Sequence, residues 1–147
     1  MKETILREIE FGSKEYKDEL DLRNKALRLP LGLDIYDEDL KGEKDDTHIG
    51  AFHKSKLAGV LVLTNIGDGV VRMRQVAVAD EMRRRGIGKK LIQYAEEFLR
   101  TKGYNEIMVH SRMTATDFYK NLGYSVTSEV FTEVMIPHVE MRKNING

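Results

Sequence analysis

The chain has no cysteine in its 147 residues. Without cysteine it can form no disulfide, no thiolate metal site and no cysteine nucleophile. It also has no apolar run long enough to cross a membrane, and its first ten residues, MKETILREIE, lack the apolar core of a signal peptide. We therefore expect a cytoplasmic protein that has neither a bound metal nor a membrane partner.

The chain also lacks net charge, because its 24 basic and 24 acidic side chains cancel. A zero balance argues against nucleic acid as a partner, since nucleic-acid-binding domains are usually basic overall. The length is that of an ordinary single domain, and no internal repeat, low-complexity tract or linker interrupts the sequence. We expect one globular domain over residues 1–147.

Charged side chains are nevertheless gathered in two segments. Residues 72–90 hold seven basic groups against two acidic ones, and residues 34–46 hold seven acidic groups against two basic ones. The basic segment surrounds a glycine turn, which suits a small, multiply phosphorylated ligand better than a DNA track. We expect the acidic segment to be a solvated loop, although it could attract a cationic amine.

Hydrophobic periodicity predicts three helices. Ser13 is the expected N-cap of the first helix, and Pro30 closes it. The second helix starts at Ile87, and Gly103 is its expected C′ residue. A short third helix is expected over 114–122, ahead of a glycine.

Alternating or continuous apolar runs predict the strands, and the acidic segment between the first helix and the second strand is expected to be irregular. The expected strands cover residues 2–11, 47–53, 56–64, 70–79, 106–110, 124–131 and 138–143, with a break at Pro137. Strands that alternate with helices, together with early and late hairpins, indicate a mixed α/β or α+β sheet.

The turn RRRGIG at residues 83–88 joins the apolar stretch Val76-Ala77-Val78 to the second helix. Its glycines let backbone N–H groups face a ligand, the helix N-terminus adds partial positive charge, and the arginines add forked donors. The turn is thus suited to a phosphate group. It does not match a P-loop, because Gly88 is followed by Lys89-Lys90 without a second glycine at the required distance, and it does not match a dinucleotide fingerprint, because Leu91 stands at the place of the third glycine. The alternative is an ordinary strand-to-helix turn with solvated arginines.

Two motifs resemble the GNAT acetyltransferase superfamily. Arg83, Gly86 and Gly88 match its acyl-CoA loop, Gln/Arg-x-x-Gly-x-Gly/Ala, without gaps. Residues 115–124, ATDFYKNLGY, resemble its second element, Ala-x-x-Phe-Tyr-x-x-x-Gly-Phe/Tyr, at the expected place downstream. The likeness is specific over residues 70–124 and looser elsewhere, where it is similar to a poorly characterised bacterial branch.

The resemblance implies a GNAT-like acyl-CoA N-acyltransferase fold, with a central, mostly antiparallel sheet and flanking helices. It implies transfer of acetyl from acetyl-CoA to a primary amine by direct attack in a ternary complex. The acceptor would be a small-molecule or peptide amine. A catalytically weak module that binds or senses acyl-CoA is the alternative.

The resemblance also implies roles for particular residues. The backbone of the strand end would pair with the pantetheine arm, the turn would hold the pyrophosphate, and Tyr119 would protonate the departing thiolate. We add Arg112, which stands where many members have an asparagine seven residues before the tyrosine. The predicted cofactor-binding residues are Val76, Ala77, Val78, Arg83, Arg84, Arg85, Gly86, Ile87, Gly88, Lys89 and Arg112.

The chain departs from the family pattern at the general base, because the strand before the loop carries no carboxylate. His110, His138, Glu133 and a water chain are the candidates that remain. Arg23 and Arg28 could line an acceptor pocket or could be solvated helix arginines. An exposed final strand would make a homodimer by sheet extension plausible.

Overall fold

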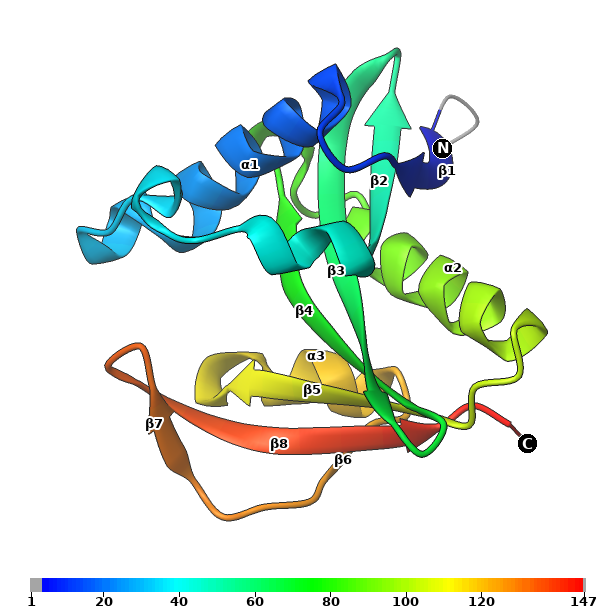
Figure 1. Cartoon of the computed structure of the whole chain (residues 1–147). Coiled ribbons are helices and arrows are strands. Elements are labelled where there is room, and N and C mark those ends of the chain that lie inside the picture. The colour runs from blue at the N-terminus through cyan, green and yellow to red at the C-terminus, as the bar shows by residue number, and fades with distance from the viewer. Residues whose placement is uncertain (1–3, 147) are drawn as a thin grey trace. The chain divides into compact units, whose positions relative to one another are not determined.

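The computed structural model describes residues 4–146. The strands are β1 (Thr4–Ile9), β2 (Thr47–His53), β3 (Lys56–Gly67), β4 (Val70–Val78), β5 (Glu106–Arg112), β6 (Ser125–Val126), β7 (Phe131–Glu133) and β8 (Ile136–Asn144). They are hydrogen-bonded in the order β1-β2-β3-β4-β5-β8-β6, and β7 pairs with β8 outside this path (Figure 1). The β4–β5 pair is parallel, whereas the pairs β1–β2, β2–β3, β5–β8, β6–β8 and β7–β8 are antiparallel.

The predicted fold class, a mixed sheet that is mostly antiparallel and has flanking helices, is therefore confirmed. The α-helices are α1 (Lys14–Leu27), α2 (Ile87–Thr101) and α3 (Thr116–Asn121). Five short 3-10 helices occur in the described part of the chain: η1 (Leu29–Leu31), η2 (Ile35–Asp37), η3 (Lys41–Asp45), η4 (Asp80–Met82) and η5 (Met113–Ala115). None of the helices within residues 4–146 combines the length and the apolarity that a bilayer crossing needs.

The chain divides into two compact units, each built from separate segments. The first unit holds the residues through Thr64 together with Gln75–Ala95, and the second holds Asn65–Arg74 and the residues from Glu96 onward. Strands β3 and β4 and helix α2 each contribute residues to both units.

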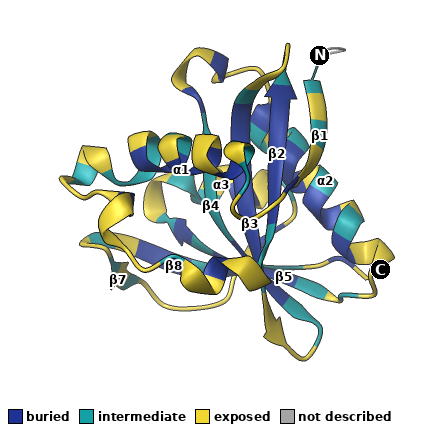
Figure 2. Cartoon of the chain, turned by 45° about the horizontal axis from the view of Figure 1, so that its top comes forward, coloured by how far each residue is buried: buried dark blue, intermediate teal, exposed yellow. Residues whose placement is uncertain are grey.

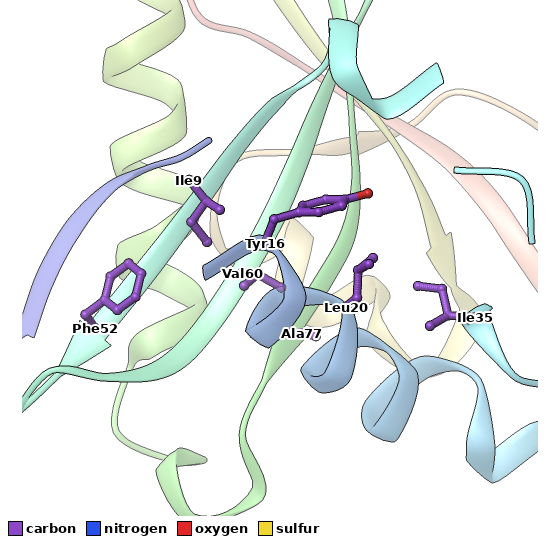
Figure 3. Close-up of a cluster of buried hydrophobic side chains, with 7 residues drawn as sticks. All are labelled: Ile9, Tyr16, Leu20, Ile35, Phe52, Val60 and Ala77. Carbon is purple, nitrogen blue, oxygen red and sulfur yellow. The ribbon is translucent and has the colours of Figure 1, made fainter. Parts of the chain in front are cut away.

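In the first unit, α1 packs on the sheet through a cluster of buried apolar side chains (Figure 3). The predicted N-cap is confirmed, because the Ser13 hydroxyl accepts a hydrogen bond from the Tyr16 N–H at 3.1 Å. The helix ends at Leu27, ahead of Pro30, which lies in η1. The start of the expected first strand at Lys2 lies outside the described residues. The cluster comprises Ile9, Tyr16, Leu20, Ile35, Phe52, Val60 and Ala77.

Strands β2 and β3 are almost wholly buried along their central residues (Figure 2). They are covered on both faces in the first unit, since α1 packs on one and α2 on the other. A Cβ built on Gly59 of β3 would lie 2.9 Å from both Ile87 Cγ2 and Leu91 Cδ1. Glycine at this position therefore lets the start of α2 approach the sheet, and this contact fixes the turn that precedes the helix.

Helix α2 follows the predicted pattern, and Ile87, Leu91, Ala95 and Leu99 are buried. Gly103 adopts φ +84°, and the Tyr104 N–H donates to the Leu99 carbonyl at 3.1 Å. This is the C′ role expected of the glycine.

Two-residue turns of left-handed residues join the strands of three hairpins. The pairs are Lys54-Ser55, Asp68-Gly69 and Val134-Met135, each with positive φ at both positions. Such turns match the twist of antiparallel strands. Because Asp68-Gly69 is the whole of its turn, β3 runs on to Gly67, beyond the Thr64 expected from sequence.

The expected strand over 124–131 is wrong, because the structure has β6 and β7 separated by a loop. The expected break at Pro137 is also wrong, since this proline lies inside β8. Proline has no N–H to donate. Pro137 faces Thr132, one pair beyond the hairpin's closing pair Glu133–Ile136, so its nitrogen points away from β7. On the other side β5 has already ended at Arg112, so no ladder bond is lost.

The expectation of an irregular, solvated loop over the acidic segment is wrong in two respects. The segment contains the 3-10 helices η2 and η3, and both Ile35 and Glu43 are buried. The final strand is not an exposed edge either, because β8 pairs with β5 on one side and with β6 and β7 on the other. A homodimer formed by extension of this strand thus loses its structural basis.

Candidate functional site

The glycine turn before α2 lies in the first unit and is open to solvent. Gly86 has φ +76°, a conformation that side chains rarely adopt, and no atom lies within 4 Å of the position its Cβ would take. Arg84 is also left-handed, with φ +63°. Arg83, Arg84, Arg85 and Lys89 are all exposed. The turn therefore presents bare backbone and several cations to any ligand that approaches it.

Helix α2 begins immediately behind this turn. The Lys90 N–H donates to the Gly86 carbonyl at 3.0 Å, which makes Gly86 the residue that caps the helix. The N–H groups in the first turn of a helix have no partner within it and carry partial positive charge. They belong here to Ile87, Gly88 and Lys89. The Ile87 side chain is itself buried in the core, so this residue can offer a ligand only its backbone.

The end of β4 carries a free edge. The Ala79 N–H donates to the Ala58 carbonyl of β3 at 2.8 Å. Because backbone groups alternate along a strand, Ala77 also faces β3, and Val76 and Val78 direct their N–H and carbonyl groups the opposite way. The β4–β5 ladder runs only to the pair Met73–Val109. Val76 and Val78 thus have no strand partner on that side in the described chain, whereas the backbone groups of Ala77 face β3. The cofactor contact expected of Ala77 stays a prediction.

Gln75 precedes this edge and has an unusual conformation. Its φ is +57°, although it lies within a strand. The left-handed conformation costs a residue with a side chain ~1–2 kcal/mol. The Gln75 Oε1 accepts hydrogen bonds from Arg23 Nε and from Arg28 Nη2, each at 3.2 Å. Two charged donors therefore hold the side chain of a residue whose backbone is strained.

Arg23 belongs to a buried ionic cluster, which we call the Arg23 cluster: Glu19, Arg23, Glu43 and His48. Arg23 Nη1 donates to Glu19 at 2.8 Å and to Glu43 at 2.8 Å, and Nη2 donates to Glu43 at 2.7 Å. Arg23 is 0% exposed. The sequence suggests an arginine that lines a pocket or is solvated. Arg23 is neither, because it is fully buried. Arg28 lies beside the cluster and pairs with Glu38.

His48 completes the charge balance of this cluster. Its Nδ1 lies 2.8 Å from Glu19 and its Nε2 lies 2.9 Å from the Glu43 carbonyl, so both nitrogens face acceptors. Burial alone would lower the pKa of His48, but the hydrogen bond and charge of Glu19 and the contacts with Glu43 outweigh it and raise the pKa. A protonated His48 and Arg23 then balance the two carboxylates.

Glu19, Glu43 and His48 also have the donor types of a metal site, with ligand atoms within 4.8 Å of one another. The Arg23 guanidinium donates to both carboxylates, however, and a cation in their midst would be repelled by it. The arrangement fits an ion-pair network, in which the Glu19 Oε1 is left as a buried oxygen without a partner among the described residues.

Tyr119 lies in the second unit, on α3, and is 9% exposed. Burial raises the pKa of Tyr119 to about 12, so the phenol is neutral at physiological pH. Its ring packs edge-on against Phe118 and Tyr124, at centroid distances of 5.2 and 5.6 Å. The hydroxyl has no hydrogen-bond partner within residues 4–146, so its proton is not committed elsewhere.

The three residues that the sequence offers as separate candidate bases lie together in the second unit. We call this group, with the arginine beside it, the Glu133 cluster: Arg72, His110, Glu133 and His138. Glu133 Oε1 lies 2.9 Å from His110 Nδ1, and Glu133 Oε2 lies 3.8 Å from His138 Nε2. Arg72 Nη2 lies 3.1 Å from His110 Nδ1 and 3.6 Å from Glu133. Burial would raise the pKa of Glu133, but the bond to His110 and the surrounding positive groups lower it.

The neighbours of His110 indicate which ring nitrogen carries a proton in the neutral tautomer. Arginine can only donate a hydrogen bond and a carboxylate can only accept one, so Nδ1 cannot serve Arg72 and Glu133 together. We assign the Nδ1 proton to the bond with Glu133, because a bare nitrogen lone pair would repel the carboxylate. In the neutral ring the lone pair then belongs to Nε2, which is the arrangement of a histidine oriented by a carboxylate.

His110 and Tyr119 lie on opposite faces of the sheet in the second unit. His110 is opposite Glu140 in the β5–β8 ladder, and Ile107 is opposite Lys143, three residues away and therefore on the other face. Lys143 contacts Glu96 at 3.0 Å, and Glu96 accepts from the Tyr124 hydroxyl at 2.9 Å. Tyr119 packs on Tyr124, so it shares the Lys143 face.

The predicted site residues divide between the two units. The strand end and the glycine turn, residues 76–78 and 83–89, belong to the first unit. Tyr119, the Glu133 cluster and Arg112 belong to the second. Arg112 is half-buried at the end of β5, where it faces His138. The Arg23 cluster has no signal in the sequence beyond the four-residue spacing of Glu19 and Arg23.

Comparison with known proteins gives a consistent result. Residues 32–145 match the profile of a family described as acetyltransferase (GNAT) domain. The uncharacterized protein YyaT of Bacillus subtilis is 29% identical over 113 residues, which cover 77% of this chain and 76% of that protein.

Solved structures share the fold at lower identity. An acyl-CoA N-acyltransferase from Pseudomonas aeruginosa has a TM-score of 0.80 at 20% identity, over 95% of this chain and 97% of that chain. An aminoglycoside 6′-N-acetyltransferase complexed with coenzyme A has a TM-score of 0.77 at 19% identity, over 96% of this chain and 97% of that chain.

The raised pKa of His48 predicts how stability depends on pH. Its protonated form is favoured by folding, so its contribution is complete below its ordinary value of 6.5 and is lost as pH rises through the folded pKa. The free energy of unfolding should therefore fall as pH increases above neutrality. Urea unfolding from about pH 6 to about pH 9 measures this slope.

His48→Gln should flatten that slope, whatever it does to the absolute stability. His53→Gln is the matched control, because the His53 ring is half-buried, contacts the Thr4 hydroxyl at 3.3 Å, and should keep the wild-type slope when replaced. An unchanged slope in His48→Gln would show that His48 is not the titrating group.

Proposed function

Because the chain belongs to the GNAT acetyltransferase family, we propose that it transfers the acetyl group of acetyl-CoA to a primary amine. The acceptor is a small molecule or a peptide, and the amine attacks directly in a ternary complex within one domain. The observation that carries the proposal is the free edge at Val76 and Val78, directly followed by a cationic glycine turn. The pantetheine amides of coenzyme A can pair with the free edge, and its phosphates can bind to the glycine turn.

The residues of the strand end and the glycine turn fit acetyl-CoA. Val76 and Val78 have N–H and carbonyl groups without a strand partner in the described chain, which can pair with the pantetheine amides as an added strand would. The open space beside Gly86 admits a phosphate against bare backbone. The exposed cations at 83–85 and 89 supply charge, with Arg83 already near Asp80 at 3.3 Å. A neighbour in fold was crystallised with coenzyme A, which supports this ligand class.

Two groups of the chain would move protons in the reaction. The His110 Nε2, oriented through Glu133, takes a proton from the attacking ammonium or amine, and a backbone N–H of the free edge stabilises the oxyanion. The neutral Tyr119 hydroxyl gives its proton to the departing thiolate.

A module that binds acyl-CoA without turnover is the second candidate, because β4 carries no carboxylate that could act as base. The Glu133 cluster makes this interpretation weaker, since it supplies a carboxylate and an oriented histidine from other strands. Release of free thiol from acetyl-CoA in the presence of a panel of amines separates the two functions.

Gly86→Val tests the cofactor site. A valine side chain would fill the space that we assign to phosphate, so acetyl-CoA binding should fall below detection in calorimetry, and the ligand should no longer raise the melting temperature. Gly12→Val is the matched control, because Gly12 has φ +80° and equally open surroundings. It should bear the same backbone strain and bind acetyl-CoA normally. Wild-type affinity in Gly86→Val would overturn the assignment of the turn.

Tyr119→Phe tests the general acid. The ring and its packing stay, while the proton donor is lost, so kcat should fall by about 10²-fold, at the lower end for general acid catalysis because a thiolate leaves readily. Acetyl-CoA affinity should stay near wild type. The measurement is steady-state turnover with an active amine, beside cofactor affinity. Unchanged turnover would make Tyr119 a packing residue.

His110→Gln tests the base. Turnover should fall by about 10²-fold or more, and the rise of kcat/KM with pH on the acidic side of the profile should disappear. Glu133→Gln removes only the orienting charge. Its turnover should therefore fall less than that of His110→Gln, and the rise of kcat/KM with pH should remain. If Glu133→Gln abolishes the rise of kcat/KM with pH and His110→Gln keeps it, the Glu133 carboxylate is the base. His53→Gln, in the first unit, should leave the whole profile unchanged.

A further inference from the structure

We propose that Gln75 is a positioning residue, and that the Arg23 cluster exists to hold it. Its side chain, anchored by Arg23 and Arg28, would keep β4 in the left-handed conformation that aims the Val76 N–H out of the free edge. The inference rests on the proposed function, because that edge is where the acetyl donor is placed.

The backbone geometry gives the first step. One peptide plane carries both the Gln75 carbonyl and the Val76 N–H, so the dihedral angles of Gln75 set the direction of that N–H. Gln75 has φ +57° within strand β4. A residue with a side chain leaves this conformation unless its surroundings enforce it. If Gln75 relaxed to the ordinary strand conformation, the plane would turn and the Val76 N–H would change direction.

The anchor gives the second step. Arg23 Nε and Arg28 Nη2 both donate to the Gln75 Oε1 at 3.2 Å. Arg23 cannot follow a moving partner, because its Nη1 and Nη2 atoms donate to Glu19 and Glu43 and it is fully buried. Arg28 is held in turn by two bonds to Glu38, at 2.6 and 3.2 Å. The amide oxygen of Gln75 therefore has two fixed attachment points.

The cost of burying charge gives the third step. A buried ion pair is weak evidence for stability, since a well-packed apolar group often serves as well. An apolar group, however, cannot donate a hydrogen bond to the side-chain oxygen of Gln75, as Arg23 does. The Glu19 and Glu43 carboxylates fix the plane of the Arg23 guanidinium, and its Nε is the donor that is turned toward β4. The cluster is thus arranged as a rigid support whose free end is Gln75.

Three versions of position 75 distinguish positioning from other roles. Gln75→Ala removes the anchor and disfavours the left-handed conformation, so kcat should fall by about 10²-fold, as expected for a misdirected catalytic group. Gln75→Gly removes the anchor but adopts the left-handed conformation without steric cost, so kcat should recover to within about tenfold of wild type. KM for acetyl-CoA should change little in either, since most binding contacts are elsewhere. Gln93→Ala, at an exposed glutamine of α2, is the control.

A readout independent of activity accompanies the kinetics. Backbone carbon chemical shifts, or a crystal structure, report the conformation of residue 75 in each variant. We expect residue 75 to leave the left-handed region in Gln75→Ala and to stay there in Gln75→Gly. Thermal unfolding of each variant shows whether the fold is retained.

Each outcome decides the proposal. The proposal would be overturned if residue 75 stays left-handed in Gln75→Ala, because the side-chain anchor would then not be needed for that conformation. It would also be overturned if the kcat of this variant equals that of the wild type, because the conformation would then not be needed for turnover. Equal kcat losses in the alanine and glycine variants would overturn it in favour of direct substrate contact by the Gln75 amide. A wild-type protein that turns over no amine would refute the proposed function instead, and the conformational measurement would still decide the role of Gln75.

Discussion

The buried contact between Arg23 and Glu43 is the interaction on which the first unit depends. It joins α1 to η3, and through Glu19 and His48 it extends to β2, whereas through Gln75 it reaches β4. Removing one partner of a buried pair leaves the other charge uncompensated and typically costs ~3–5 kcal/mol. An apolar core lies beside this network, with Tyr16 belonging to both, because its hydroxyl donates to Glu43 at 2.7 Å. Packing holds the helix on the sheet, and the ionic contacts determine where along the sheet it is held.

In the second unit, the two faces of the sheet carry different groups of polar side chains. The β5–β8 ladder places His110 with Glu140 on one face and Ile107 with Lys143 on the other. The first face carries the Glu133 cluster, whereas the second carries Tyr119, Tyr124 and Glu96 in a buried setting. The alternation of side chains along the ladder therefore keeps the neutral phenol and the histidine that contacts Glu133 in different environments.

Local features were predictable from sequence and long-range pairing was not. Ser13, Gly86 and Gly103 act through the conformation of their own turns, so their residue type alone carried the signal. The role of Arg23 was not predictable, because its four-residue spacing from Glu19 is also that of a solvated helix pair. Its decisive partner lies twenty residues away, in a segment with the composition of an exposed acidic loop. The place of Pro137 inside a strand depends on where β5 ends, which no property of residues 136–144 reveals.

The hairpin that carries Glu133 has a consequence for heat tolerance. Strand β7 has three residues, and its turn consists of Val134 and Met135, both left-handed and 50% and 75% exposed. A short ladder closed by a strained, solvent-facing turn opens at far less free energy than the whole fold. Glu133 precedes that turn directly, so opening would detach the carboxylate from His110 while the remaining strands stay paired. If the Glu133 cluster acts as the proposed base, warming would lower turnover below the temperature at which circular dichroism records melting, and cooling would restore it.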